Sequence, residues 1–162
     1  MRGSIVDIFL IMAVVFAIGI TLVLGDYILT TEQNAFNQTP YGNLTNDTFN
    51  KGIASLGIFD GAMSFLFAGL LIATLISAFM IRSHPVFFVV CIIVLAIALT
   101  FSGILANTYT QLFTGNALSD SANKMTTTAL IMNNLPYIVI GFGVLLMIVT
   151  FGKSYSQQGG NI

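Results

Sequence analysis

Residues 62–106 read AMSFLFAGLLIATLISAFMIRSHPVFFVVCIIVLAIALTFSGILA and form two long apolar runs joined by Arg82-Ser83-His84-Pro85. A helix needs about 20 apolar residues to cross a hydrocarbon core about 30 Å thick. Each run has that length, and the short segment between them allows only a tight turn, in which Pro85 suits the first turn of the second helix. This stretch therefore predicts two membrane-spanning helices packed as an antiparallel hairpin.

Two further stretches have the same character, so the chain is predicted to be an all-α integral membrane protein with four transmembrane helices. The predicted spans run from about Ile5 to Gly25, Ala62 to Ile81, Val86 to Ala106 and Leu135 to Phe151. The composition agrees, because 56% of the 162 residues are hydrophobic and only 7% are charged, against about 25% charged in a soluble domain. The first stretch is longer than the apolar region of a signal peptide and lacks a cleavage site before Asp26, so we interpret it as a retained anchor.

Basic residues near the predicted spans indicate how the helices are oriented. Arg2, Arg82 and Lys153 would share one face of the membrane, and Lys51 and Lys124 the other. Since cytoplasmic loops carry the excess of Lys and Arg, both termini are expected in the cytoplasm for a plasma or inner membrane, or in the interior for a virion membrane. The same count assigns four acids to the outer loops: Asp26, Glu32, Asp47 and Asp120.

The two halves of the chain resemble each other. A shift of 73 residues lays the second predicted span over the fourth and gives five identities within ten positions. It aligns Gly42-Asn43 with Gly115-Asn116, Asp47 with Asp120, and Asn50-Lys51 with Asn123-Lys124. We therefore predict two tandem antiparallel hairpins, residues 1–82 and 83–162, related as parallel repeats about an axis along the membrane normal.

The second helix of each half is predicted to begin before the membrane. Apolar residues recur at helical spacing ahead of the second span, at Phe49, Ile53, Leu56 and Phe59. Asn46 or Asp47 is a suitable N-cap, and Ser119-Asp120 is the equivalent start in the second half. Helices from these starts to the inner surface would be about 50 Å long, so both would extend beyond the outer membrane surface. The outer loops and extensions would comprise residues 26–61 and 107–134.

Asp60 lies just before the second predicted span, and the repeat aligns it with Asn133. Acids inside a span usually mark a proton or ion pathway. Counting about 20 residues back from Arg82 places the outer hydrocarbon boundary near Ala62. Asp60, Asn133 and Asn134 are therefore predicted to form a polar layer at the interface, with a conduction path as the alternative.

Pro136 is predicted to kink the fourth helix, because proline removes a backbone donor and crowds the preceding turn. In the alternative, the released carbonyls line a cavity or bind a cation, as broken helices do in transporters.

A stripe of small residues follows one face of the second span, at Gly57, Gly61, Ser64 and Ala68. Such stripes allow close helix packing in membranes. The sequence leaves open whether this stripe packs within the chain or between copies.

Several chemistries are disfavoured by the sequence. The net charge of -1 gives no basic surface for nucleic acid. One cysteine, Cys91, and one histidine, His84, cannot build a metal site within the chain. No nucleophile motif, phosphate loop or dinucleotide fingerprint is present, so we expect neither a cofactor nor enzymatic activity.

Three N-x-Thr acceptors, at Asn37, Asn43 and Asn46, fit an extracytoplasmic first loop and would be glycosylated only in a host that performs this modification.

Four spans with a larger first outer loop resemble tetraspanins and claudins in outline, but the outer loops lack cysteine and those families' motifs. The chain also resembles phage holins, small membrane subunits of large complexes and virion membrane proteins in outline. We expect a structural or accessory membrane protein that acts by helix packing, in a homo-oligomer or beside other membrane proteins. The alternative is a small channel, holin-like pore or carrier that uses Asp60, Asn133 and the Pro136 kink.

Overall fold

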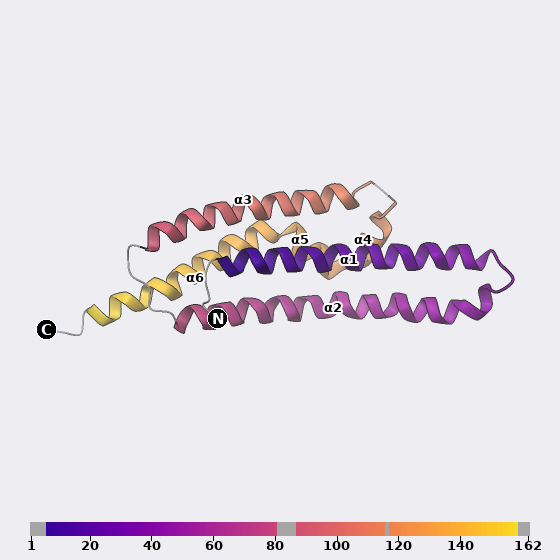
Figure 1. The fold of residues 1–162 in the computed structure, drawn as a ribbon, viewed down its shortest axis with the longest axis horizontal. Coiled ribbons are helices and arrows are strands. Elements are labelled where there is room, and N and C mark those ends of the chain that lie inside the picture. Colours follow the sequence, from indigo (N-terminus) through magenta and orange to yellow (C-terminus); the bar gives the residue numbers. More distant parts are fainter. Residues whose placement is uncertain (1–5, 81–86, 116, 159–162) are drawn as a thin grey trace.

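The computed structural model describes residues 6–80, 87–115 and 117–158, and every regular element within them is a helix. Three long helices come first: α1 (Val6–Asn37), α2 (Gly42–Met80) and α3 (Phe87–Phe113). Two short helices follow, α4 (Ser119–Lys124) and α5 (Thr126–Asn133), before the longer α6 (Leu135–Gln158). Figure 1 shows their order along the chain.

Four of the helices are long and apolar enough to cross a membrane. Their apolar segments are Asp7–Asn37, Gly42–Met80, Phe88–Phe113 and Leu135–Gly152. The predicted all-α fold with four candidate spans is thus confirmed. Arg2 and the Arg82–Pro85 turn, including His84, lie outside the described residues, as does the side chain of Lys153.

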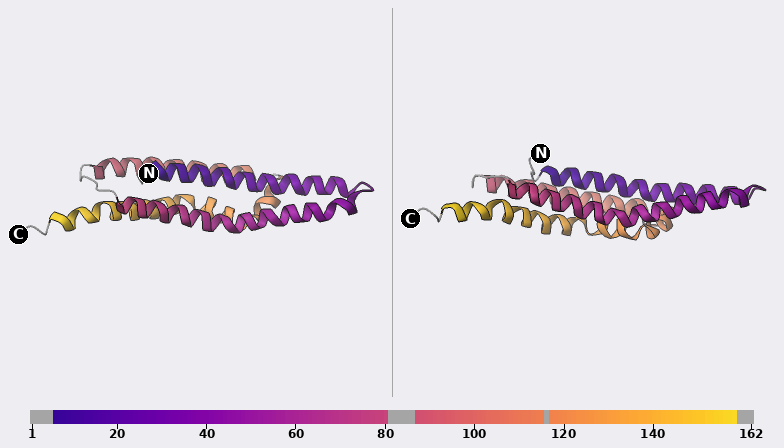
Figure 2. Two further views of the ribbon diagram at one scale, coloured as in Figure 1. Left: turned by 60° about the horizontal axis from the view of Figure 1, so that its bottom comes forward. Right: turned by 90° about the horizontal axis from the view of Figure 1, so that it is seen from below.

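The long helices run along one common axis (Figures 1 and 2). α1 lies beside α2 over most of its length, and α3 lies along α6. α1 begins and α6 ends at the same end of the bundle, which we call the proximal end. At the opposite, distal end, α1 and α2 continue past the other helices as a two-helix arm.

Apolar and amide side chains hold the distal arm together. The rings of Phe36 and Phe49 have centroids 5.6 Å apart. The Gln33 side-chain amide donates to Asn46 Oδ1 at 3.1 Å and to Asn50 Oδ1 at 2.8 Å. The helices of the arm are therefore paired by specific contacts well beyond the membrane-length part of the bundle.

The core of the bundle is apolar along its length. In the distal half it includes Val15, Val23, Met63, Met125 and Met132. In the proximal half it includes Met12, Ala98, Leu135, Phe142 and Leu146. The outer surface is also apolar, and exposed side chains such as Phe65, Ile72, Ile97 and Ile148 suit contact with lipid.

α2 extends even further than predicted. It begins at Gly42, a few residues before the predicted cap at Asn46 or Asp47, and runs for 39 residues without a break. Gly42 permits this early start, because a Cβ at that position would lie 2.9 Å from Asn37 Cα across the turn. Of the predicted apolar stripe, Phe49, Ile53 and Leu56 are partly buried whereas Phe59 is exposed.

The second half differs from its prediction. One long helix was expected from Ser119-Asp120 onward, but the structure has three helices, α4, α5 and α6, with breaks at Met125 and Asn134. Met125 leaves helical geometry with φ -85° and ψ 66°. The break at Asn134 lies two residues before Pro136, and that at Met125 has no proline near it.

Candidate functional site: a buried acidic cluster

Asp60 on α2 is almost completely buried and binds the first turn of α5. Asp60 is only 4% exposed to solvent. Asp60 Oδ2 accepts the backbone N–H of Thr127 at 3.0 Å, and Oδ1 accepts that of Thr128 at 2.8 Å. Both carboxylate oxygens are thus directed at the N-terminus of another helix.

This contact provides hydrogen-bond acceptors that the residues just before α5 do not supply. The first N–H groups of any helix lack intrahelical partners, and a Ser, Thr, Asp or Asn N-cap usually accepts one of them. The N-cap of α5 is Met125, which makes no side-chain cap hydrogen bond. Asp60 supplies the missing acceptor from α2, and its negative charge also suits the positive end of the helix dipole. The carboxylate thereby allows α5 to begin directly after the interruption of the helix at Met125.

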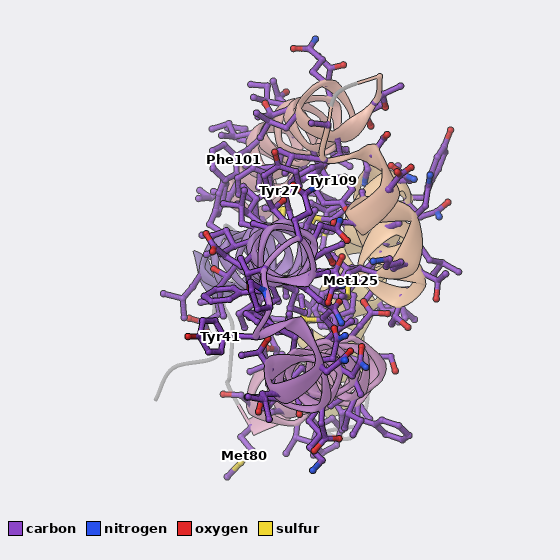
Figure 3. All side chains as sticks on the ribbon, turned by 90° about the vertical axis from the view of Figure 1, so that its right-hand side faces the viewer. Tyr27, Tyr41, Met80, Phe101, Tyr109 and Met125 are labelled. Atoms are coloured by element: carbon purple, nitrogen blue, oxygen red, sulfur yellow. The ribbon has the colours of Figure 1, made fainter. Side chains whose placement is uncertain are left out.

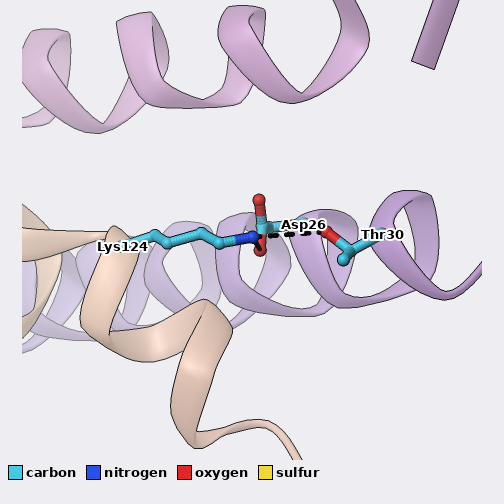
Figure 4. A network of polar contacts seen from close by, with 3 residues as sticks. All are labelled: Asp26, Thr30 and Lys124. Carbon is cyan, nitrogen blue, oxygen red and sulfur yellow. Dashed lines mark hydrogen bonds and ion pairs between the residues drawn. The ribbon is translucent and has the colours of Figure 1, made fainter. Parts of the chain in front are cut away.

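A second buried acid, Asp26, lies on α1 and is fully buried. Its Oδ2 is 3.3 Å from Lys124 Nζ, and the same ammonium group is 3.4 Å from Thr30 Oγ1, as Figure 4 shows. The Lys124 side chain is 48% exposed. The ion pair therefore joins α1 to the end of α4 and has one partner within reach of water.

Tyr109 and Thr128 complete the cluster. Tyr109 on α3 is 3% exposed and packs edge-on against Phe113, with ring centroids 4.7 Å apart. Thr128 is fully buried, and its methyl group packs against Gly19, where a Cβ would lie only 2.9 Å from it. Gly19 therefore lets α1 and α5 approach closely.

The end-on view of Figure 3 places Tyr109 and Met125 among the helices, whereas Met80 projects from the periphery. The cluster draws side chains from α1, α2, α3 and α4 and backbone donors from α5. We call Asp26, Asp60, Tyr109, Lys124 and Thr128 the acidic cluster. Its polar contacts join α1 to α4 through Asp26 and Lys124, and α2 to α5 through Asp60.

The residues predicted to form a polar layer do not come together. Asp60 meets the start of α5, whereas Asn133 and Asn134 lie at its far end and are exposed. Asn133 Oδ1 accepts the Thr110 hydroxyl at 3.4 Å, and the Asn134 side-chain amide donates to the Leu130 carbonyl at 2.8 Å. About 8 Å of helix separates the two groups.

Pro136 is the second residue of α6. Helical bonding resumes around it at once, since the Ile138 N–H donates to the Asn134 carbonyl at 3.0 Å. The interruption between α5 and α6 is therefore confined to Asn134.

The small-residue stripe of α2 faces outward. Gly57, Gly61, Ser64 and Ala68 are all exposed. A Cβ at Gly57 or Gly61 would meet no atom within 4 Å. Gly57 and Gly61 are therefore not used for close packing against another helix of the described chain.

The three glycosylation acceptors lie at the distal arm. Asn37 ends α1 and Asn43 is the second residue of α2, and both are exposed. Asn46 is partly buried, and its side-chain oxygen is engaged by Gln33.

Sequence reasoning missed Asp26, Lys124, Tyr109 and Thr128 as members of a site. Asp26 was assigned to an outer loop, although it directly follows Gly25 and remains within α1. The apolar residues that follow it, Tyr27, Ile28 and Leu29, indicate that the helix carries on past Asp26.

Within the described chain, no group of three or more His, Cys, Asp or Glu side chains is arranged to hold a metal ion. In comparisons with known proteins, no family model, curated protein or solved structure matches the chain.

Proposed function

We propose that this chain is a structural or accessory membrane protein that acts by helix packing within a homo-oligomer or a larger membrane complex. The observation that carries the proposal is the outward-facing stripe of small residues on α2. In a membrane, close contact between small residues replaces the hydrophobic effect as a driving force for helix association. A stripe that is unused inside the chain is therefore available to a neighbouring helix.

The geometry of the stripe suits such a contact. Gly57, Gly61, Ser64 and Ala68 recur at intervals of four, three and four residues, so they follow one helical face. The Ser64 hydroxyl donates to the Gly61 carbonyl at 3.0 Å, which satisfies the one polar side chain of the face. The backbone of a second helix could approach this face without displacing any side chain of the first.

The apolar surface of α2 also continues past the predicted membrane boundary. Ile58 and Phe59 are 74% and 62% exposed, and they directly precede Asp60 near the outer end of the hydrocarbon region. Apolar side chains exposed at the outer end of the hydrocarbon region indicate a contact with another protein or with the membrane. Ile58 lies about a quarter turn from the stripe around α2 and Phe59 lies nearly opposite it, so a second copy packed along the stripe would not cover Phe59.

We further propose that the four spans form two tandem antiparallel hairpins of common origin. The five identities at a shift of 73 residues support this proposal. The halves have since diverged in detail. Gly115 has φ +76°, a conformation that favours glycine, whereas its partner Gly42 lies at a close approach of the chain to Asn37.

A direct experiment compares oligomeric state among matched variants. The double variant Gly57→Leu, Gly61→Leu adds bulk where the chain itself has open space, and Gly141→Leu does the same on α6, where a Cβ also meets nothing within 4 Å. We expect the wild type and Gly141→Leu to be oligomeric in mild detergent and in lipid nanodiscs, and the α2 variant to be monomeric, as measured by native mass spectrometry. A wild type that is monomeric in both media and copurifies with no other protein would refute the proposal.

The proposed orientation, with both termini inside, has its own test. Single cysteines at Ser55, Ser83 and Ser156 in a Cys91→Ser background would be probed with a membrane-impermeant thiol reagent. We expect Ser55→Cys to react in intact cells and the other two only after permeabilisation. The opposite labelling pattern would reverse the orientation.

A further inference from the structure

The break between α4 and α5 occurs where the local sequence does not require one. Met125 has ψ 66°, whereas a residue of an α-helix has ψ near about -42°. The segment 119–133 contains no proline or glycine, and the three threonines that follow Met125 are themselves helical in α5. At the position that the proposed repeat aligns with Met125, α2 continues through Gly52, although glycine is the weaker helix former. The break therefore needs a cause outside the local sequence.

Helical hydrogen bonding continues up to Met125 from both sides. Its N–H donates to the Ser121 carbonyl at 3.3 Å, and its carbonyl accepts the N–H of Ala129 at 3.0 Å. Both bonds join residues four apart, as in a continuous α-helix. The departure from helical geometry is therefore confined to the residues around Met125.

Two N–H groups just after the break have a choice of acceptors. In a continuous helix, Thr127 and Thr128 would donate to the carbonyls of Asn123 and Lys124. In the structure they donate to the two carboxylate oxygens of Asp60, at 3.0 and 2.8 Å. The carboxylate of α2 thus takes the place of the carbonyls that would join α5 to α4.

Buried acids from two other helices hold the two sides of the break. Asp60 binds the first turn of α5, and Asp26 of α1 pairs with Lys124, the last residue of α4, at 3.3 Å. Joining the two helices would change ψ of Met125 by about 110°, so α4 and α5 could not both keep these contacts. A buried carboxylate that loses its partner costs free energy. The two acids therefore favour the break.

We propose that Met125 is a hinge with a bent form and an extended form, and that Asp60 holds it in the bent form. In the extended form, α4 and α5 are one helix and the threonine N–H groups bond within it. α5 packs against α1, α2 and α3, whereas α4 packs against α1 and α5, so α4 is the part that moves. Release of Asp60 from α5 would swing α4 away from α1 and separate Lys124 from Asp26.

The backbone carbon chemical shifts of Met125 report its conformation directly. By NMR of the protein in lipid nanodiscs, we expect non-helical shifts for Met125 in the wild type and helical shifts in Asp60→Ala, which removes both acceptors. Asp47→Ala is the matched control on the same helix, since the Asp47 side chain is 76% exposed, and it should leave the Met125 shifts unchanged. Helical shifts in the wild type, or non-helical shifts in Asp60→Ala, would overturn the proposal.

A proline at position 126 tests the hinge with Asp60 in place. Proline suits the first residue of a helix, which Thr126 is in α5, but it disrupts a helix interior. We expect Thr126→Pro to keep the folded-to-unfolded ratio within about twofold of the wild type in an SDS titration. Ile53→Pro, at the aligned position inside the continuous α2, should lower the ratio about a hundredfold. An equally large loss in Thr126→Pro would overturn the proposal, because residue 126 would then lie inside a continuous helix.

Discussion

Asp60 Oδ1 accepts a 2.8 Å hydrogen bond from the backbone N–H of Thr128, which lies 68 residues later in the chain and on a different helix. Through this bond and its neighbour at Thr127, a side chain of α2 caps α5. A cap supplied from another helix makes the start of α5 depend on the packing of the whole bundle. The variants below follow from that dependence.

Asp60→Asn should destabilise the protein by about 1–3 kcal/mol, because the carboxamide offers one acceptor where two N–H groups need partners. The measurement is SDS-induced unfolding in mixed micelles. Asp47→Asn is the matched control, since the Asp47 side chain is 76% exposed and pairs with Lys51 on its own helix, and its effect should stay within about 0.5 kcal/mol. Equal stability of the two variants would show that Asp60 does not cap α5.

Lys124→Gln should destabilise the protein by about 1–3 kcal/mol, because it leaves the buried Asp26 carboxylate without its cation. The double variant Asp26→Asn, Lys124→Gln removes both charges and should recover part of that loss. A double-mutant cycle, measured by the same unfolding titration, gives the coupling between the two residues. Strictly additive effects would argue against a functional ion pair.

Gly143→Ala and Gly141→Ala should have opposite effects, although they lie one residue apart on either side of Phe142. A Cβ at Gly143 would overlap the Leu95 side chain of α3, whereas a Cβ at Gly141 meets nothing within 4 Å. We expect Gly143→Ala to cost about 1–3 kcal/mol through overpacking. Gly141→Ala should be neutral or stabilise by up to about 1 kcal/mol, because alanine favours the helix. Thermal unfolding in detergent would measure both, and a neutral Gly143→Ala would mean that α3 and α6 pack less closely.

Liposomes that contain the purified protein should retain a trapped fluorescent dye as well as liposomes without protein. Between the acidic cluster and the proximal end, the buried polar side chains of the described chain include Thr74 and Ser102, each of which donates to a carbonyl of its own helix at 2.8 Å. A cavity in this part of the bundle is lined by apolar side chains, among them Met12, Phe67 and Phe142. Dye release that disappears in Asp60→Asn would instead favour the pore alternative.

The sequence predicts the four spans well, because apolar length is a property of each segment alone. The early extension of α2 is also foreseeable, since its apolar spacing continues ahead of the membrane. The division of the second half is not. Thr126-Thr127-Thr128 contains no proline or glycine, and the start of α5 after Met125 is capped by Asp60 from another helix, which the local sequence does not indicate.

The members of the acidic cluster are harder to predict for the same reason. Asp26 and Tyr109 lie at the ends of apolar stretches, where side chains can face water, lipid or protein with equal ease. Which of these they face depends on the rotation of each helix in the bundle. The proposed repeat aligns Asn133 with Asp60 and suggested that the two lie in one layer. Aligned positions need not meet, because α2 is one continuous helix whereas the corresponding segment of the second half is divided into α4, α5 and α6.

The distance in sequence between Asp60 and its donors has a consequence for assembly. When α1, α2 and α3 have formed, Asp60 still lacks the N–H groups of α5, and Asp26 still lacks Lys124. Both carboxylates then lack the partners that they have in the folded chain. Their partners come from residues 119–133, so the two short helices α4 and α5 complete the interior of the long helices that precede them.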